Sequence, residues 1–398
     1  NDVDSILWYI ENYEFTNEDE KESVVYLIKQ LGFLKSPRIV GYLTKKYQRA
    51  MDDYKIQIAC LKALAKQGSK QSFKEIKKLL IQDAPITPND RLITQFFRYL
   101  DDSLALTAKL YPDAWDLLLY TDYRTSLYKL SAMLLDSNLI NSKSYKREQP
   151  LILREAKEAT AKKKSYSNGA ENISLSDHTI YYRFGKPIKY EINLIDQYSF
   201  TAYLKLLMPF YNSNPKVKNY VRSLLTHKKE KFRFISTVTL TKHNIAINDS
   251  LYRNLSKSPD YRFAFYKALK FINREDKFDQ QYLNQQSMME SVLYASSSID
   301  AEDSLKFIKK VLIKNKSDEG YVYFFKHQDS HSEKWYIHYA GLQPINARLF
   351  NLSTKKRYIK KKAATVFNEQ EIVEEVEKLV KELKLFGRNR AEKQKSRY

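Results

Sequence analysis

A helical hairpin recurs near the start of the chain, and this repeat limits the fold more than any other feature. Apolar residues follow the spacing of one helix face up to Leu31, and Ser36-Pro37 then opens a second helix. The same order of helix, break and helix returns around Leu64 and Ser69, in each case after 33 residues. This offset is typical of two-helix solenoid repeats. The pattern therefore predicts a mainly α protein built from stacked helical hairpins.

The shortage of glycine supports this prediction. Only 8 of the 398 residues are glycine and 10 are proline. Strand-rich folds and loops that cradle a ligand usually need more glycine for turns and for close approaches of the backbone. Long helices with short connections need little glycine, and a chain of this length is too large for one hydrophobic core. We therefore expect two or more helical lobes.

The helical pattern is interrupted once in the middle of the chain. We predict that residues 1–152 form an N-terminal helical lobe and that residues 188–298 form a second helical-repeat lobe. Between them, residues 153–187 contain a basic run, a polar stretch with Asn168-Gly169 and a β-leaning run. Loops this long are uncommon inside a compact domain. We expect residues 153–187 to form a basic and polar loop or hairpin between the lobes.

Beyond residue 298 the hydrophobic period changes from helical to alternating, which is typical of β-strands. Within residues 299–345, three strand-like runs occupy Lys306–Ile313, Tyr321–Lys326 and Trp335–Gly341. They predict a small antiparallel β-meander. Residues 346–398 are predicted to be a basic linker followed by a charged terminal helix. The apolar stripe of that helix is short, so packing against the meander is favoured over a coiled coil.

Part of the first lobe resembles a HEAT repeat. In the stretch Asp53–Gly68, an acidic residue opens the helix, and the small residues Ala59 and Ala63 allow a neighbouring helix to approach. Residues 230–240 and 260–269 keep the acidic start, a basic residue and the closing leucine, but they lack the glycine. The resemblance implies a HEAT-like α-solenoid in two lobes. Such solenoids present extended surfaces to a partner rather than a catalytic pocket.

The order of elements over the whole chain resembles the C-terminal region of long TraB/GumN-family proteins of Bacteroidota. The resemblance rests on the helical hairpins and on Leu206–Tyr211, Gly320–Lys326, Trp335 and Gly341–Pro344. Proteins of that family carry a hydrolase-like or metalloprotease-like domain with Gly-x-x-His motifs ahead of a helical region. This sequence contains no such motif. The resemblance therefore implies a non-catalytic region located in a bacterial cell envelope, either in the periplasm or at a membrane.

Motifs for catalysis are missing from the sequence. It contains neither a Gly-x-Ser-x-Gly elbow nor a glycine-rich phosphate loop. The single cysteine, Cys60, falls in an apolar helical pattern, where we expect a small buried hydrophobe. His327, His331 and His338 have the best spacing for a metal, but the first two straddle a predicted hairpin loop, where solvated polar residues are expected. We expect no enzyme activity, no cofactor and no metal.

The charge of the chain is its strongest functional signal. Its 68 Lys and Arg residues against 47 Asp and Glu residues give a formal net charge of +21, which favours polyanions as ligands. Two basic runs lie in predicted loops, although a charge run is more often simply solvated. The candidate residues for contact with a polyanion or another partner are Lys162, Lys163, Lys164, Lys355, Lys356, Arg357, Lys360, Lys361 and Lys362.

These features predict a non-catalytic helical-repeat scaffold that binds a protein partner in the bacterial cell envelope. One alternative is a HEAT-like protein that binds nucleic acid or another acidic polymer, with a cytoplasmic location. Another is the accessory C-terminal region of a TraB/GumN-type hydrolase. The chain starts at Asn1 without a leader segment, so we expect a mature form or a fragment. No apolar run is long enough to predict a transmembrane segment.

Overall fold

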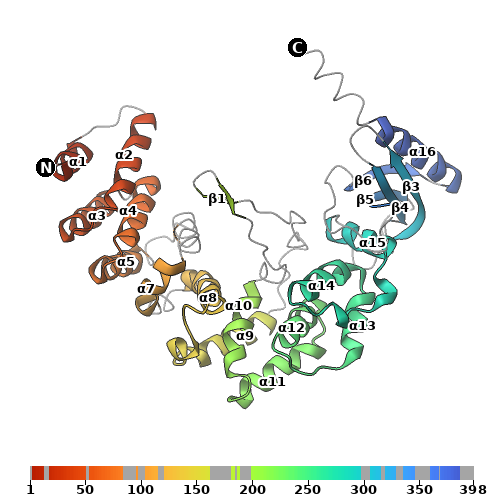
Figure 1. The fold of residues 1–398 in the computed structure, drawn as a ribbon, viewed down its shortest axis with the longest axis horizontal. Coiled ribbons are helices and arrows are strands. Elements are labelled where there is room, and N and C mark those ends of the chain that lie inside the picture. The colour runs from red at the N-terminus through yellow and green to blue at the C-terminus, as the bar shows by residue number, and fades with distance from the viewer. Residues whose placement is uncertain are drawn as a thin grey trace, which may run out of the picture. The chain divides into compact units, whose positions relative to one another are not determined.

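A computed structural model divides the protein into two compact units (Figure 1). Unit 1 comprises Asn1–Ala159 and Ser199–Lys218, and unit 2 comprises Thr160–Tyr198 and Asn219–Tyr398. The structure describes residues 2–12, 18–50, 53–83, 96, 104–114, 121–161, 181–183, 186–188, 199–296, 305–314, 319–328, 335–345, 359–366 and 368–385. Among the helices in these ranges, none is both long and apolar enough to cross a lipid bilayer.

Unit 1 is built from helices. The first five are α1 (Asp2–Asn12), α2 (Glu18–Leu31), α3 (Pro37–Arg49), α4 (Tyr54–Gln67) and α5 (Lys70–Asp83). They are followed by α7 (Leu104–Ala114), α8 (Thr121–Asp136), the short 3-10 helix η2 (Ser142–Tyr145), α9 (Gln149–Ala161), α10 (Ser199–Leu207), η4 (Met208–Phe210) and α11 (Pro215–Ser223). The chain passes from unit 1 to unit 2 within α11.

Helices α2 to α5 stack as two hairpins in two layers. Helix α2 packs against α4, helix α3 packs against α5, and α4 also contacts α3 and α5. The apolar stripes of these helices are buried, and both Leu31 and Leu64 are fully inaccessible to solvent. The sequence offset of 33 residues therefore corresponds to one hairpin of the stack. The mainly α fold predicted from this offset is confirmed.

Hydrogen bonds join the end of α4, in the second hairpin, to the turn between α2 and α3, in the first hairpin. The side-chain amide of Gln67 in α4 donates to the carbonyl oxygen of Leu34 at 2.7 Å and accepts from the backbone N–H of Ser36 at 3.3 Å. Gly32 lies so close to Ala63 that a Cβ on this glycine would come within 3.0 Å of the Ala63 Cα atom. Consecutive hairpins are thus held in a fixed register.

Unit 2 combines helices with antiparallel strands. Its helices are η5 (Leu224–Thr226), α12 (Glu230–Lys242), α13 (Asp249–Lys257), α14 (Pro259–Phe271), η6 (Glu275–Lys277), η7 (Gln280–Tyr282), α15 (Gln285–Ser296) and the terminal α16 (Glu369–Leu385). Helix α14 is central, because it packs against α12, α13 and α15.

Arg262 of α14 links three of these helices from a buried position. Its guanidinium group donates to the carbonyl oxygens of Ser256 at 2.9 Å and Lys257 at 2.7 Å, which lie at the end of α13. It also donates to the carbonyl oxygen of Ser287 at 2.7 Å and the carboxylate of Glu290 at 2.8 Å, both on α15. Because only 3% of Arg262 is exposed, its charge depends on these partners rather than on water.

Asparagine takes the place of glycine at the ends of three helices. Asn138, Asn244 and Asn273 follow α8, α12 and α14, and each has a φ of 55°, in the left-handed region. The backbone N–H of Asn244 donates to the carbonyl oxygen of Thr241, and the N–H of Ile245 donates to the carbonyl oxygen of Leu240, both at 3.0 Å. These two hydrogen bonds form a Schellman motif. Asparagine tolerates this backbone conformation better than other residues with a side chain. The weaker repeat copies therefore end without the glycine that the HEAT pattern has.

Asn273 provides a test of this capping role. Replacing Asn273 by alanine is expected to lower the free energy of unfolding by about 1 kcal/mol, because alanine disfavours the left-handed conformation. Replacing the same residue by glycine should leave stability nearly unchanged, since glycine adopts this conformation freely. Urea unfolding of both variants would measure the difference. An equal loss in the glycine variant would show that the side chain, and not the backbone, is required.

The described residues of unit 2 also form two antiparallel sheets. The strands β1 (Tyr181–Arg183) and β2 (Lys186–Ile188) form a small hairpin. A four-stranded sheet has the order β3 (Lys306–Lys314), β4 (Glu319–Gln328), β5 (Trp335–Gln343) and β6 (Ile359–Val366). The predicted meander corresponds to β3, β4 and β5. The fourth strand lies in a segment predicted to be a linker, so that prediction was wrong for residues 359–366. Its three consecutive lysines weaken the β signal in the sequence, although an edge strand tolerates them.

The predicted interruption between the lobes is also shorter than expected. Helix α9 continues to Ala161, so residues 153–161 are helical rather than part of a loop. The chain continues the helix here because Ile152, Leu153 and Ala156 are buried against the rest of unit 1. The hairpin of β1 and β2 falls inside the remainder of this segment.

Helix α16 covers one face of the four-stranded sheet. Its residues Ile372, Val376 and Leu379 form a buried cluster with Val322 and Phe324 of β4. The prediction that the terminal helix packs against the meander is confirmed. Side chains alternate between the two faces of a strand, and on the opposite face the hydroxyl of Tyr323 donates to Gln285 of α15 at 2.7 Å.

Candidate interaction surfaces

The basic residues predicted as contacts fall in different kinds of segment. Lys162, Lys163 and Lys164 lie outside the described residues, as do Lys355, Lys356 and Arg357. Lys360, Lys361 and Lys362 are in β6, where they pair with Tyr339, His338 and Ile337 of β5. The predicted loop is therefore wrong for these three residues. Among the described strands β6 lies at the edge of the sheet, and lysines are common in edge strands because their charge opposes pairing with the strand of another chain.

Two of the three histidines with the best spacing for a metal lie inside the four-stranded sheet, and of these two only His327 was predicted to be solvated. His327 and His338 are 3% and 0% exposed, and Nδ1 of His327 lies 2.6 Å from Nε2 of His338. The prediction of solvated residues at a hairpin tip is wrong for His327, because β4 continues past this position. The imidazole ring of His327 stacks on the ring of Tyr336 in β5. His331 lies outside the described residues. In the part of the chain that the structure describes, no group of three or more His, Cys, Asp or Glu residues could hold a metal ion.

Cys60 has the role predicted for it. It is fully buried in α4 between the two layers of hairpins. Burial raises the pKa of its thiol to about 12. A nucleophilic cysteine needs a lowered pKa and access to a substrate, so this thiol is a packing group.

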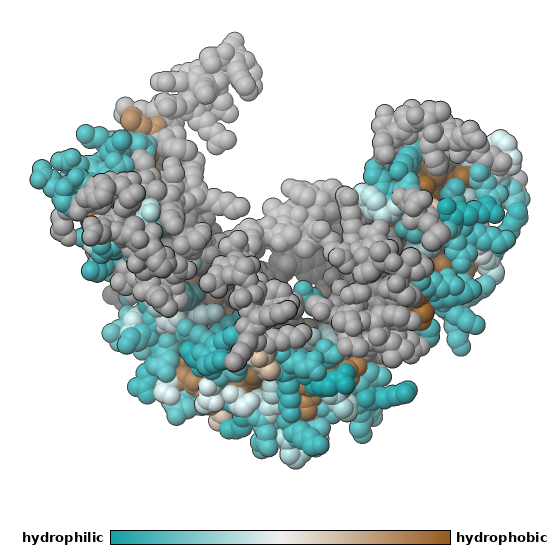
Figure 2. Space-filling model, turned by 180° about the vertical axis from the view of Figure 1, so that it is seen from behind, coloured by the Kyte–Doolittle hydropathy of each residue, from teal (hydrophilic) through white to brown (hydrophobic). Residues whose placement is uncertain are grey.

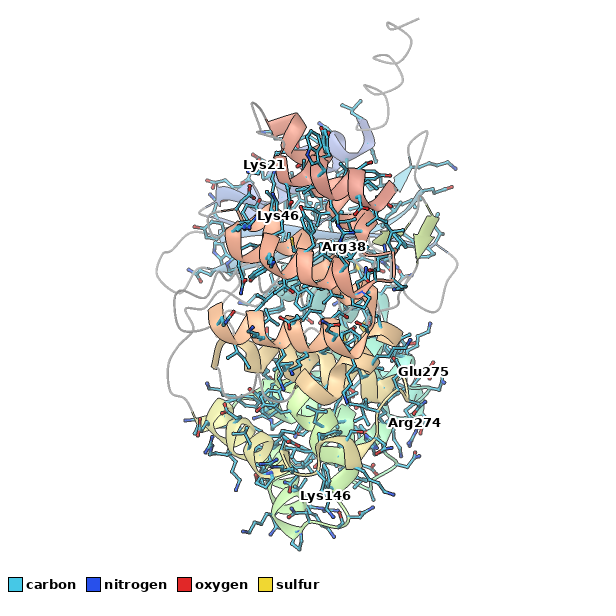
Figure 3. The ribbon with its side chains drawn as sticks, turned by 90° about the vertical axis from the view of Figure 1, so that its left-hand side faces the viewer. Lys21, Arg38, Lys46, Lys146, Arg274 and Glu275 are labelled. Carbon is cyan, nitrogen blue, oxygen red and sulfur yellow. The ribbon has the colours of Figure 1, made fainter. Side chains whose placement is uncertain are left out.

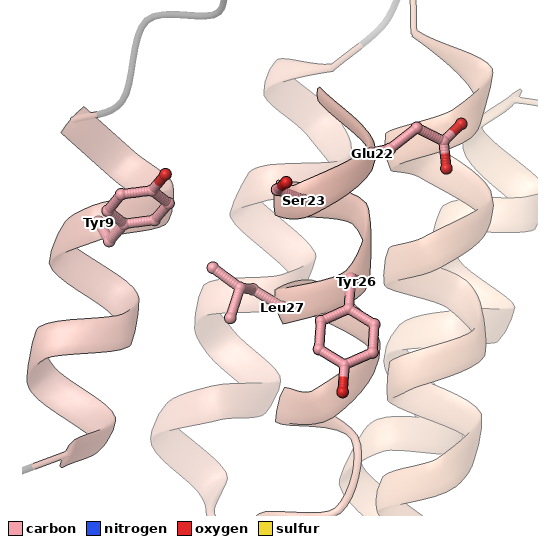
Figure 4. A pocket seen from close by; sticks show the side chains of 5 residues that line it. All are labelled: Tyr9, Glu22, Ser23, Tyr26 and Leu27. Atoms are coloured by element: carbon pink, nitrogen blue, oxygen red, sulfur yellow. The ribbon is translucent and has the colours of Figure 1, made fainter. Parts of the chain in front are cut away.

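A shallow groove opens between α1 and α2 (Figure 4). It has a volume of about 440 Å³, which is within the range of sites that take a small ligand or a few large side chains. Tyr9 and Leu27 point toward one another across it in Figure 4. The groove is lined by Tyr9, Glu22, Ser23, Tyr26 and Leu27.

The rim of the groove is aromatic. The side chain of Tyr26, which lines the groove, is 61% exposed. Trp8 precedes Tyr9 in α1 and is 67% exposed, but it is not among the residues that line the groove. The carboxylate of Glu22 points away from α1 and pairs with the ammonium of Lys55 in α4 at 3.0 Å. The lining therefore combines the rings of Tyr9 and Tyr26 with the aliphatic side chain of Leu27, and the two tyrosines and Ser23 carry hydroxyl groups.

The layer formed by α3 and α5 has the opposite character. Gly41 lies on the exposed surface of this layer. Among the side chains of α3 and α5 that the structure describes, Glu75 is the one acidic side chain, and it is partly exposed. Arg38 is paired with Asp4 of α1 at 2.6 Å. The exposed residues of these two helices, among those whose side chains are described, are Pro37, Arg38, Gly41, Lys45, Gln48, Arg49, Lys70, Gln71, Lys74, Lys78 and Gln82.

Five of these residues, Lys45, Arg49, Lys70, Lys74 and Lys78, form what we call the basic stripe. Within each helix they are spaced by four residues, which places them on one helix face. Lys46 is excluded, because it is half-buried and donates to the carbonyl oxygen of Ile10 at 3.0 Å. Figure 3 shows Lys46 and Arg38 on α3 among the side chains of the N-terminal helices. The sequence signal for the stripe is basic residues at helical spacing, rather than in a run.

No family model, curated protein or solved structure matches this chain. The resemblances to HEAT repeats and to TraB/GumN-family proteins therefore stay predictions. On the face drawn in Figure 2, hydrophobic residues occur as small groups among hydrophilic ones.

The two surfaces of unit 1 suit different ligands. The groove offers aromatic and aliphatic contacts with a few hydroxyl groups, which suits apolar side chains of another molecule. The basic stripe offers positive charge without an apolar centre, which suits an anion. Both are carried by packed helices, so the side chains are presented on a rigid scaffold.

Proposed function

We propose that this chain is a non-catalytic helical-repeat scaffold that binds a protein partner through the groove between α1 and α2. The observation that carries the proposal is the aromatic lining of this groove on a stack of helical hairpins. A location in a bacterial cell envelope is part of the proposal, and it rests on the resemblance to TraB/GumN-family proteins.

Interface energetics support a protein partner at this groove. Tryptophan and tyrosine are enriched among the residues that contribute most to protein binding, because they bury a large area with few rotatable bonds. Tyr9 and Tyr26 line the groove and Trp8 is exposed on the same helix as Tyr9. Leu7 and Ile10 of α1 are buried, so this helix is anchored while Tyr9 lines the groove. The partner segment would insert a large apolar side chain between α1 and α2.

Selection from a displayed library of random peptides tests this proposal with the full chain as bait. We expect the enriched peptides to share a large aliphatic or aromatic residue. Replacing Leu27 by glutamate should weaken their binding at least tenfold, about 1.4 kcal/mol, because a carboxylate would enter the apolar space. The matched control is Lys29→Glu, which introduces the same group on an exposed position of α2 outside the groove.

The two variants give a clear decision. Binding that is lost in Leu27→Glu and kept in Lys29→Glu supports the groove as the partner site. Peptides that bind both variants as well as the original chain would rule out the groove.

A further inference from the structure

We infer that the basic stripe on α3 and α5 is a second binding surface, and that its ligand is the phosphate backbone of a nucleic acid. This inference is independent of the groove, because it concerns the other layer of the helical stack. It rests on three features of the stripe, which are its positive charge, its lack of an apolar centre and the regular spacing of its basic residues.

The charges of the stripe are available to a ligand. Lys45, Arg49, Lys70, Lys74 and Lys78 are all exposed. Within the described ranges, none of these five side chains forms an ion pair with a carboxylate. Neighbouring like charges repel one another, and an anion that approaches all five relieves this repulsion. A ligand with several regularly placed negative charges therefore gains most from this surface.

The stripe lacks the features of a protein-binding surface. The aromatic residues of these helices point inward: Tyr42 is 8% exposed, Tyr47 is 1% exposed and Phe73 is 4% exposed. Protein interfaces are usually centred on aromatic or aliphatic residues, and lysine is depleted from them. A lysine-rich surface without an apolar centre matches a polyphosphate better than an acidic protein.

The spacing of the stripe fits separate phosphate groups. Lys70, Lys74 and Lys78 are each four residues apart, which corresponds to about 6 Å along the helix. Packed helices lie about 8 to 10 Å apart, so Lys45 and Arg49 on α3 add a second row beside the first. Each cation can reach its own phosphate. Because the stripe is mainly lysine, which binds phosphate as a point charge, we expect binding without sequence preference.

Fluorescence anisotropy with a labelled random-sequence DNA duplex tests this inference on the full chain. Binding should weaken with added salt, and the slope of log affinity against log salt should be about −4 to −5 if all five cations contact phosphates. The triple variant K70Q/K74Q/K78Q should bind at least tenfold more weakly at low salt and flatten the slope by about 3. Circular dichroism would confirm that the variant is folded.

A matched variant removes the same charge elsewhere. K228Q/K257Q/K270Q changes three exposed lysines of unit 2, and we expect it to retain most of the affinity. An equal loss in both variants would overturn the inference, because binding would then follow net charge alone. Polyglutamate that binds the chain as tightly as the duplex would also overturn it, in favour of an acidic protein. Neither outcome affects the peptide experiment at the groove, so the two proposals fail separately.

Discussion

Replacing Arg262 by methionine is expected to lower the free energy of unfolding of unit 2 by about 3 to 5 kcal/mol. The variant keeps much of the side-chain volume but removes the donors to Ser256, Lys257, Ser287 and Glu290. The carboxylate of Glu290 then loses its cation, and three carbonyl oxygens lose a donor. Each buried polar group left without a partner costs about 1 to 3 kcal/mol. The cation–π contact with the ring of Tyr282 is lost as well.

Urea unfolding followed by tryptophan fluorescence measures this effect in a chain whose other two tryptophans, Trp8 and Trp115 of unit 1, are replaced by phenylalanine. The remaining Trp335 packs against the buried cluster of unit 2. Arg253 provides the matched control, because it is an exposed arginine on α13. Arg253→Met should change stability by no more than about 0.5 kcal/mol. If Arg262→Met is as mild as Arg253→Met, the buried guanidinium does not hold α13, α14 and α15 together.

Two glycine-to-alanine substitutions in unit 1 are expected to have opposite signs. Gly32→Ala should destabilise unit 1 by about 1 to 3 kcal/mol, because the new methyl group would lie 3.0 Å from both the Ala63 Cα atom and the Lys66 Cβ atom. Gly41→Ala should stabilise it by about 0.5 to 1 kcal/mol, because Gly41 lies inside α3 and its Cβ would have no neighbour within 4 Å.

Thermal and urea unfolding followed by circular dichroism would measure both glycine variants. The pair separates a general effect of alanine from the close approach of two hairpins. If Gly32→Ala is as stabilising as Gly41→Ala, the contact between the loop after α2 and α4 is not tight, and the stacked register described above is incorrect.

The helices of the first two hairpins were predictable because local and tertiary signals agree there. Buried residues of α3 and α5, such as Leu43 and Leu79, recur at helical spacing, and Pro37 and Gly68 mark a helix start and a helix end. The strands β3, β4 and β5 were predictable from alternation in the same way. Where the pattern of one segment is sufficient to bury a complete face, sequence alone identifies the element.

The sequence-based predictions were wrong where tertiary contacts, rather than the local pattern, determine the structure of a segment. The strand β6 forms because β5 offers a free edge to pair with, and the run of lysines in residues 360–362 hides this from any local pattern. The pairing of His327 with His338 depends on the register of β4 against β5, which the sequence does not specify. The asparagine caps were missed because glycine was the expected residue at helix ends.

The candidate surfaces were only partly predictable. The net charge indicated a polyanion as an alternative ligand, but the runs of three basic residues in the sequence lie outside the described residues or in the edge strand β6, and not on α3 and α5. Lys70, Lys74 and Lys78 are separated by other residues, and they come together only on a helix whose exposed face is known. The groove depends on the distance between α1 and α2, which no sequence pattern reports.

Hydrogen exchange of the full chain, with and without a selected peptide, tests the central claim most directly. The claim is that a partner binds in the groove of a rigid helical stack. It predicts slower exchange in α1 and α2 when the peptide is bound, with α3, α5 and the sheet of unit 2 unchanged. Slower exchange confined to α12 to α16, or to the basic stripe, would contradict it.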